Sequence, residues 1–495
     1  MTSPDHFGPS TAAFEGLVGF FAGPGAAEMT HAELEARLKT DGFAVLRQVF
    51  QDHLDLRATR EERALAVVGA DGTRRGYAEA DHQRPLVTIF GPVMAERIAY
   101  RRKGAANLHP ADGALNLPDE LYSHGLRELA AIESARGSFD EAKDAIGRSA
   151  AAPVPKRQVE GLAQAAAVDF EAYNERSRRT AAGPGEVVVI SADGKGVVMR
   201  PEGLRAATAA KAAKSQKKLA GRLSRGEKAN RKRMAELGAV YAVTPVPRSP
   251  QDIMARSGDD RPKESPKAKA KWLTASVVDD AAAVIAKIFD EADRRDPDHS
   301  HDWVALVDGN NHQIDRIEAE AAAREIDITI VVDWVHVLEY LWRSAWSFFC
   351  EGDPAAEDWV HDKAVEVLEG RASTVAGAIR RKATTLNLDD GTRKNADTCA
   401  DYLLAKAPYL DYPTALAQGW PIATGVIEGA CRYIVKDRMD ITGARWGLEG
   451  AEAVLKLRAL RSNDEWESYW SFHLAQERRR VHESRYFGGV IPTAA

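Results

Sequence analysis

The chain has 495 residues, which is too long for one ordinary hydrophobic core, so we expect several domains. Hydrophobic residues make up 44% and charged residues 28%, and no run of about 18 apolar residues occurs, which argues for a globular protein without a membrane span. A formal net charge of −6 excludes a general polycation, so any affinity for nucleic acid has to come from local basic patches.

Cysteine usage and the N-terminus indicate a cytoplasmic location. The three cysteines, Cys350, Cys399 and Cys431, are far apart in the sequence, which disfavours a disulfide framework and a cysteine-type zinc site. The first residues lack the basic segment that begins a signal peptide.

The first part of the chain predicts helices, then strands, then helices again. Residues 1–75 predict a helical region, and residues 76–182 a mixed region in which residues 86–93 and 97–101 predict strands separated by a Gly91-Pro92 turn or bulge. Ser138 and Glu141 have the spacing of a helix capping box. Short helices joined by turns are typical of helix-turn-helix DNA binding and equally of a helical bundle, and both interpretations stay open.

A different order of elements begins after residue 182. A strand to Asp193, a Gly194-Lys195-Gly196 turn and two further strand segments precede a helix, and a strand ending at Asp308 follows. The predicted elements are strands 187–193, 197–199 and 239–244, helix 277–289, a strand to residue 308, helix 313–324 and strand 328–333. This order predicts an α/β, ribonuclease H-like domain, in which the first and fourth strands are neighbours.

A basic segment interrupts these strands. Residues 200–235 contain twelve Lys and Arg residues, only two Glu residues and no aromatic residue. This composition favours contact with phosphates over stacking on bases. The candidate DNA contacts here are Lys217, Lys218, Arg231, Lys232 and Arg233. The alternative is an ordinary solvated helix rich in Ala and Lys.

Three carboxylates are the candidate catalytic groups. Asp193 and Asp308 end predicted strands, and Glu428 lies in the helix-like stretch 425–432. Hard oxygen ligands suit Mg²⁺, and two such ions activate the attacking oxygen and stabilise the leaving oxygen in phosphodiester chemistry. The alternative is that Asp193-Gly194 and Asp308-Gly309 are ordinary strand-ending turns, in which Asp and Gly are favoured. Asp333, with His336 one helical turn further on, is a rival to Asp308 as the second ligand.

Together these segments resemble bacterial insertion-sequence transposases with a DDE catalytic triad, most closely the Kra-type group. The similar segments are residues 90–93, 115–118, 190–196, 232–241, 305–309, 332–340, 424–432 and 436–446, within a match over about residues 80–475. The resemblance implies a largely helical N-terminal DNA-binding region, in which residues 76–182 bind the ends of the element. It also implies a ribonuclease H-like core whose first part is 183–340, a helical insertion at 341–423, and a catalytic helix with C-terminal helices at 424–495.

The resemblance also implies an activity, a site and partners. The activity is cleavage of insertion-sequence ends and strand transfer to target DNA, with Mg²⁺ or Mn²⁺ held by Asp193, Asp308 and Glu428. Asp333 and His336 would support the active site. Double-stranded DNA and a second or further copies of the chain are the expected partners, in a bacterial, nucleoid-associated cytoplasmic setting.

Two further expectations concern the C-terminal part and the activity itself. A predicted helix at 448–461 and the basic residues before it, including Arg438 and Arg445, are expected to face DNA near the cut. The alternative function is a catalytically idle DNA-binding protein or regulator of the same ancestry; the intact carboxylates favour the active enzyme.

Overall fold

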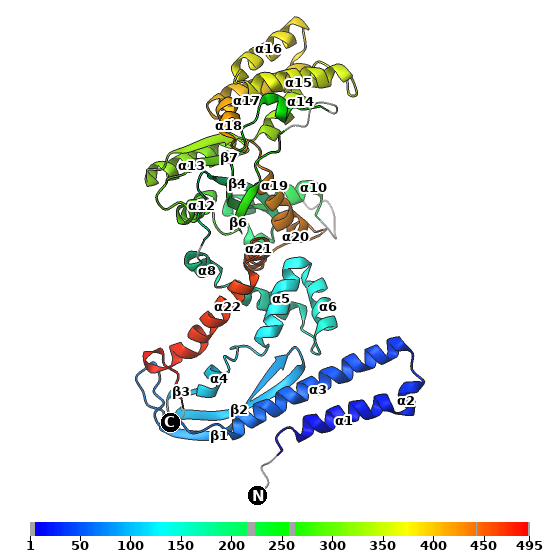
Figure 1. Ribbon diagram of the computed structural model, residues 1–495, viewed down its shortest axis with the longest axis vertical. Coiled ribbons are helices and arrows are strands. Elements are labelled where there is room, and N and C mark those ends of the chain that lie inside the picture. The colour runs from blue at the N-terminus through cyan, green and yellow to red at the C-terminus, as the bar shows by residue number, and fades with distance from the viewer. Residues whose placement is uncertain (1–4, 178, 215–222, 257–262, 442, 494–495) are drawn as a thin grey trace. The chain divides into compact units, whose positions relative to one another are not determined.

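The computed structural model describes residues 5–177, 179–214, 223–256, 263–441 and 443–493. The chain divides into two compact units: Met1–Arg176 together with Glu465–Ala495, and Ser177–Asp464. Each unit contains its own β-sheet among helices (Figure 1). Among the described residues, every helix is too short or too polar to cross a membrane.

The first unit begins with a helical hairpin. α1 (Gly8–Ala22) leads through the short α2 (Pro24–Ala27) into the long α3 (His31–Thr59). Thr30 and Glu33 form a capping box that starts α3. The predicted helical region, residues 1–75, is helical as far as Thr59, and residues 60–75 are irregular with an isolated bridge between Val68 and Arg74.

An antiparallel sheet follows, with β1 (Tyr77–Thr88), β2 (Gly91–Arg102) and β3 (Ala105–Leu108) in that order. The turn lies at residues 89–90, two residues before the predicted position, because Gly91 already pairs with Thr88. Gly91 has a φ of 115°, which glycine adopts without steric cost, so it closes the hairpin from within the strand.

Helices complete the first unit, and the C-terminal segment supplies one of them. They are α4 (Pro110–Ala114), α5 (His124–Arg136), α6 (Phe139–Ser149), α7 (Lys156–Ala166), α8 (Phe170–Arg176) and α22 (Trp466–Glu477), the last followed by short turns at Arg478–His482, Glu483–Arg485 and Phe487–Gly489. Leu126, Ile146 and Val159 form the buried core of α5, α6 and α7. The capping box of Ser138 and Glu141 is confirmed at the start of α6.

The second unit contains a five-stranded mixed sheet in the order β6-β5-β4-β7-β8. Its strands are β4 (Val187–Val198), β5 (Lys232–Val243), β6 (Ala268–Ser276), β7 (Trp303–Val307) and β8 (Ile328–Val332). β4 pairs in parallel with β7, and β7 in parallel with β8, whereas β5 is antiparallel to both of its neighbours. The predicted adjacency of the first and fourth strands is therefore confirmed.

The first strand is longer than predicted. β4 continues through Gly194 and Gly196 to Val198, paired with β5 throughout, so the predicted turn is absent and Asp193 lies within the strand. A Cβ at Gly196 would lie 2.7 Å from Lys232 Cδ, which shows that the glycine leaves space for a side chain of β5.

The third strand of the sheet, β6, was not predicted from the sequence. Two predicted segments merge into β4, and β6 takes the third place in the order. Lysines alternate along the exposed first half of β6, and only its second half, from Trp272, is buried, so the strand has no continuous apolar run. The sequence predicted three strands before the first helix of the core, and the structure has three. The predicted strand 197–199, however, is the end of β4, and β6 was not predicted.

Helices pack on this sheet and extend beyond it. α12 (Ala281–Arg295) lies against β4 and β5, with α13 (Asn311–Arg324) beside it, and α14 (Trp334–Ala345) follows β8. Shorter helices are Pro201–Gly203, α9 (Ala206–Ala213), α10 (Arg225–Ala229) and α11 (Pro250–Ile253). α9, α10 and the start of β5 fall in the predicted basic segment.

Residues 341–423 are helical, as predicted. The helices here are α15 (Pro354–Leu368), α16 (Ala372–Thr385), α17 (Asp390–Lys406), a short turn at Ala407–Tyr409 and α18 (Tyr412–Gln418). The chain then returns to the sheet through α19 (Gly425–Ala430), a π-helical turn (Cys431–Lys436), α20 (Asp437–Met439) and α21 (Leu448–Ser462), which packs on β6.

Candidate functional site

The three predicted catalytic carboxylates line one cavity of about 390 Å³ in the second unit. Asp193 comes from β4, Asp308 directly follows β7, and Glu428 lies on α19. The parallel register that pairs Ser191 with Leu306 puts Asp193 level with Asp308, because each lies two residues further along its strand direction. Sheet pairing and the returning helix thus gather three residues that are far apart in the sequence.

The two aspartates differ in how their oxygens are occupied. Asp193 Oδ1 accepts a hydrogen bond from its neighbour's N–H at Gly194 (2.6 Å), and Oδ2 accepts one from the thiol of Cys431 (3.0 Å). Asp308 Oδ1 accepts from the N–H of Asn310 at 2.8 Å. These bonds orient both carboxylates, and lone pairs remain on each for a cation.

Glu428 carries the electrostatic signature of crowded negative charge. Its pKa is raised by partial burial and then by the charges of Asp333 and Asp193, with His336 acting in the opposite direction. A divalent cation would relieve this repulsion, and carboxylate oxygens on several elements are the donor set that Mg²⁺ and Mn²⁺ prefer. The residues present therefore suit the expected ion.

Asp333, the rival candidate to Asp308 as the second metal ligand, has a structural role instead. It is fully buried, and its Oδ1 accepts from the N–H groups of Val335 (3.1 Å) and Thr424 (3.2 Å). Its Oδ2 accepts from His336 Nδ1 (2.9 Å) and from the hydroxyl of Thr424 (2.8 Å). Four hydrogen bonds occupy this carboxylate, and it is not part of the cavity wall. Asp333 instead ties the start of α14 to the segment that leads into α19.

His336 does line the cavity. Because Nδ1 is held by Asp333, Nε2 is the ring nitrogen left for a ligand. The hydrogen bond that His336 Nδ1 donates to Asp333 raises the pKa of His336 to about 8, although burial opposes this. One ligand atom from each of Asp333, His336 and Glu428 lies within 4.8 Å of the others. We favour the cavity carboxylates as the cation site, since Asp333 already has four partners.

Several residues of the cavity wall were missed in the sequence, namely Lys195, Glu339, Thr424 and Cys431. Cys431 follows Glu428 by three positions, the spacing at which two residues share a helix face, so that signal was available. Burial and then the charge of Asp193 raise the pKa of the Cys431 thiol well above its usual value, so it stays protonated and donates to Asp193. The π-helical turn that begins at Cys431 adjoins the site, a common position for such turns.

Lysines surround a smaller cavity next to the carboxylates. Lys195, Lys232 and Lys436 line this second cavity, of about 230 Å³, and Lys195 lines both. All three are exposed. They come from β4, β5 and the π-helical turn, and Asp440 lies on the same wall, so the smaller cavity carries three cations and one carboxylate.

The predicted DNA-binding residues have different positions in the structure. Arg231 is partly exposed and Lys232 is exposed, whereas Lys217 and Lys218 lie outside the described residues. Arg233 donates to the carbonyl oxygens of Val277 and Gly203. It therefore holds backbone segments of the second unit together while staying partly exposed, and its contact with DNA stays a prediction.

The two C-terminal arginines also differ from each other. Arg438 is 2% exposed, and its guanidinium lies 4.6 Å from the ring centre of Trp446. It packs inside the unit, so the expectation that it faces DNA is corrected. Arg445 is exposed, and its contact with DNA stays a prediction.

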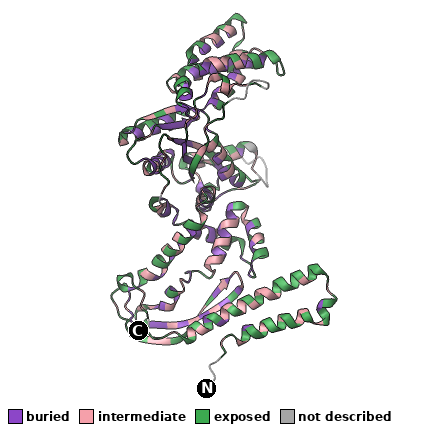
Figure 2. Ribbon diagram, in the orientation of Figure 1, coloured by how far each residue is buried: buried purple, intermediate pink, exposed green. Residues whose placement is uncertain are grey.

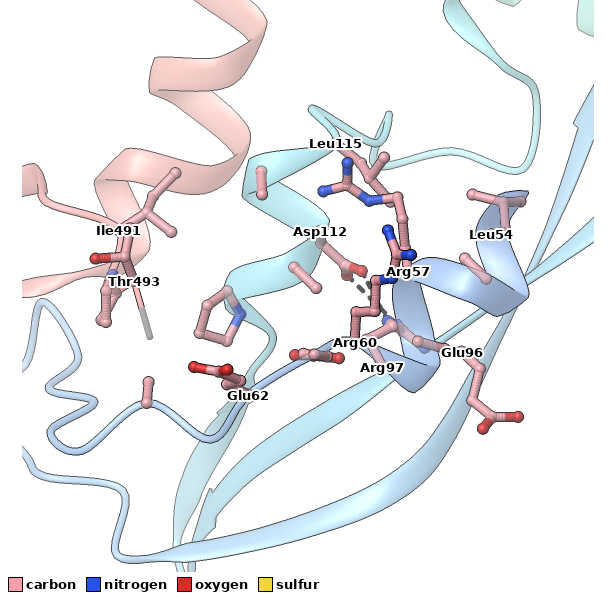
Figure 3. A pocket seen from close by; sticks show the side chains of 18 of the residues that line it. Leu54, Arg57, Arg60, Glu62, Glu96, Arg97, Asp112, Leu115, Ile491 and Thr493 are labelled. Carbon is pink, nitrogen blue, oxygen red and sulfur yellow. Dashed lines mark hydrogen bonds and ion pairs between the residues drawn. The ribbon is translucent and has the colours of Figure 1, made fainter. Parts of the chain in front are cut away.

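A larger cavity, of about 530 Å³, lies in the first unit (Figure 3). Arg57, Arg60 and Glu62 are on its wall, together with Asp112 and Arg97. Arg97 Nε donates to Asp112 Oδ1 at 2.7 Å, and Arg84 pairs with the other oxygen at 3.2 Å. This carboxylate is therefore neutralised by arginines, unlike those of the second unit, and we assign it a structural role.

The sequence was compared with protein-family models and with curated proteins. No family model matches the chain, and no curated protein matches it.

Proposed function

We propose that the chain is a DDE-type DNA transposase, with a ribonuclease H-like catalytic core in the second unit. The observation that carries the proposal is the convergence of Asp193, Asp308 and Glu428 on one cavity. The strand order β6-β5-β4-β7-β8, with only β5 antiparallel to its neighbours, supports the ribonuclease H-like assignment. The reaction is cleavage of insertion-sequence ends and strand transfer to target DNA.

The three carboxylates would hold Mg²⁺ or Mn²⁺, which supplies activation of the attacking oxygen and stabilisation of the leaving oxygen. Asp193, centrally placed on β4, is oriented by Gly194 and Cys431. Asp308 and Glu428 approach from β7 and α19. His336, fixed through Nδ1 by Asp333, lines the same cavity and would meet the substrate there.

DNA is the substrate that suits the surroundings of the cavity. Lys195 is an exposed cation on the wall of the carboxylate cavity, and the exposed Lys232 and Lys436 line the smaller cavity that shares Lys195 with it. Phosphate oxygens are the natural partners of such a group, and phosphate contacts position a duplex without reading its sequence. A substrate backbone bound by these lysines would lie next to the cation site.

The test is cleavage of plasmid DNA that carries the sequences flanking the gene, with Mg²⁺ or Mn²⁺ added. Asp193→Asn, Asp308→Asn and Glu428→Gln should each abolish cleavage, because an amide is a poor substitute for a metal-binding carboxylate. DNA binding, measured by fluorescence anisotropy, should stay close to wild type. Glu339→Gln is the matched control, since Glu339 lines the same cavity but lies outside the triad.

Two outcomes would change the proposal. Robust cleavage by the Asp308→Asn variant would remove Asp308 from the triad. Binding without cleavage by the wild-type protein, under conditions where both metals are present, would favour the alternative of an idle DNA-binding protein or regulator.

A further inference from the structure

The loop that carries Asp308 connects a buried strand to an exposed helix start. Figure 2 shows the strands of this sheet largely in the colour of buried residues, and β7 is buried along its whole length. Asn310 and Asn311, by contrast, are exposed. Asp308 lies between these two environments, and its carboxylate is oriented by the N–H of Asn310 at 2.8 Å. The direction of this carboxylate therefore depends on the backbone conformation of residues 308–310.

α17, in the helical segment 341–423, contacts this loop with two side chains. The hydroxyl of Tyr402 donates to the carbonyl oxygen of Asp308 at 3.2 Å, and the ammonium of Lys406 donates to Asn311 Oδ1. Residues four positions apart share one face of a helix, so a single face of α17 reaches both ends of the loop. Lys406 is only 5% exposed, and a buried ammonium requires such a polar partner.

Gly309 leaves the space that Tyr402 occupies. A Cβ at Gly309 would lie 2.7 Å from the hydroxyl oxygen of Tyr402 and 3.4 Å from the ring carbon that bears it. Gly309 also has a φ of 89°, which residues with a side chain rarely adopt. The residue next to Asp308 is thus suited both to the conformation of the loop and to the close approach of a tyrosine from α17.

The ring of Tyr402 is itself held in place by α14. It stacks on Tyr340, with ring centres 4.0 Å apart and planes 14° from parallel. α14 and α17 lie side by side (Figure 1), and Tyr340 follows His336 by about one helical turn. Because the stack restricts the orientation of the ring, the Tyr402 hydroxyl is directed at the Asp308 carbonyl before any ligand binds.

The same helical segment also holds the neighbouring strand. Tyr412 of α18 is fully buried, and its hydroxyl donates to the carbonyl oxygen of Val332 at 2.8 Å. Val332 ends β8 and directly precedes Asp333. Tyr402 and Tyr412 therefore bind the segment 341–423 to the carboxyl ends of β7 and β8, the edge of the sheet at which the candidate ligands lie.

We propose that Tyr402 is a positioning residue for Asp308, through which the helical segment 341–423 sets the affinity of the cavity for a divalent cation. Tyr402 is not on the cavity wall. It acts by limiting the loop to the conformation in which Asp308 lines the cavity. This role rests on the proposed function, in which Asp308 holds the cation.

The expected effect on cation binding follows from the worth of one hydrogen bond. A loop freed from this bond samples other conformations, and cation affinity falls with the fraction of molecules that keep the binding conformation. One intramolecular hydrogen bond contributes modestly, so loss of the Tyr402 hydroxyl should weaken cation binding about threefold to tenfold. Removal of a ligand carboxylate, as in Asp308→Asn, should weaken it far more.

The test is Mn²⁺ binding to the full-length protein without DNA, measured by electron paramagnetic resonance. Tyr402→Phe keeps the stacked ring and removes the hydroxyl, and it should raise the Mn²⁺ dissociation constant about threefold to tenfold. Tyr409→Phe is the matched control, because the Tyr409 hydroxyl donates to Glu318 of α13 at 2.8 Å. That variant also removes a bond between this segment and α13 but leaves the Asp308 loop unchanged, so it should bind Mn²⁺ like the wild type.

Hydrogen exchange of the metal-free protein measures the loop directly. Residues 308–312 should exchange faster in Tyr402→Phe than in the wild type, whereas exchange in β7 should be unchanged. A merely structural role of Tyr402 would instead lower the melting temperature without changing the Mn²⁺ affinity of the folded protein, and that result would overturn the inference.

Two further results would overturn it. One is an equal loss of Mn²⁺ affinity in Tyr402→Phe and Tyr409→Phe, and the other is a wild-type protein that binds no Mn²⁺. The plasmid cleavage assay separates these results from failure of the proposed function. Cleavage by the wild type, with unchanged Mn²⁺ affinity in Tyr402→Phe, removes the role of Tyr402 alone. Weakened Mn²⁺ binding by Tyr402→Phe without wild-type cleavage supports that role and contradicts the proposed reaction.

Discussion

Asp333 controls the proton affinity of His336, and this pair gives a prediction at the scale of single residues. Its hydrogen bond raises the pKa of His336 from 6.5 to about 8. Because the folded pKa lies above the unfolded value, the pair stabilises the fold fully below about pH 6.5, and this contribution is lost as the pH rises through 8.

NMR titration of the metal-free protein checks this. The His336 ring should titrate near pH 8, and Asp333→Asn should move its midpoint down toward 6.5 because an amide carries no charge. His301, which is bonded to Asp296 elsewhere in the unit, is the internal control and should not move. An unchanged His336 midpoint in the variant would show that Asp333 is not the cause.

At the scale of elements, Asp333 joins α14 to the segment that leads into α19. Its four hydrogen bonds cap α14 and hold Thr424, which precedes α19 and Glu428. Asp333→Ala should lower the free energy of unfolding of this unit by about 3 kcal/mol, because partners of a buried carboxylate are left unsatisfied. Asp353 caps α15 in the same way but at an exposed position, so Asp353→Ala should cost only about 1 kcal/mol. Urea unfolding measures both, and equal losses would contradict the account.

Packing of α12 on β5 depends on a glycine. A Cβ at Gly238 would lie 2.5 Å from Ile288 Cγ1, so the helix rests directly on the strand backbone there. Gly238→Ala should destabilise the unit by about 1–3 kcal/mol through overpacking. Gly147→Ala in α6, where a Cβ meets nothing within 4 Å, should be neutral or slightly stabilising. Thermal unfolding of the two variants compares them; a neutral Gly238→Ala would mean that α12 shifts freely.

At the scale of the whole molecule, the C-terminal segment completes the first unit. Arg127 is 1% exposed and pairs with Glu477 at 2.7 Å, and Asp169 accepts from His473 at 2.7 Å. A chain that ends at Asp464 leaves Arg127 and Asp169 buried without these partners, which is strongly unfavourable.

We therefore expect such a truncation to unfold the helices before residue 177 while residues 177–464 keep their structure. Hydrogen exchange followed by mass spectrometry measures this peptide by peptide. Protection of α5 and α7 should be lost, and protection of β4 and β7 retained. Retained protection of α5 would mean that α22 is dispensable for the first unit.

Local sequence determined the elements whose signals are local. Apolar spacing predicted the helix at 448–461, the Ser138–Glu141 capping box is a four-residue signal, and apolar runs marked the strands before Asp308 and Asp333. The helical insertion at 341–423 was predicted from the resemblance to the transposase family. The order of strands then sufficed to predict that Asp193 and Asp308 lie on neighbouring strands. The type of each element is predictable in this way because the spacing of apolar side chains along a segment reflects which of its faces is buried.

Only the tertiary structure decided what depends on contacts between distant segments. Gly194 and Gly196 resemble a turn in the sequence but give space to side chains of β5, and β6 is recognised through its pairing with β5. Arg438 is a basic residue in a predicted DNA-facing stretch, yet packing against Trp446 buries it. Asp333 and Asp308 each come directly after a strand, so the sequence does not distinguish them. The structure does, because Asp333 accepts four hydrogen bonds, two of them from Thr424, and has a structural role, whereas Asp308 lines the cavity. Burial and partners are set by segments far away in the sequence, so no local pattern contains them.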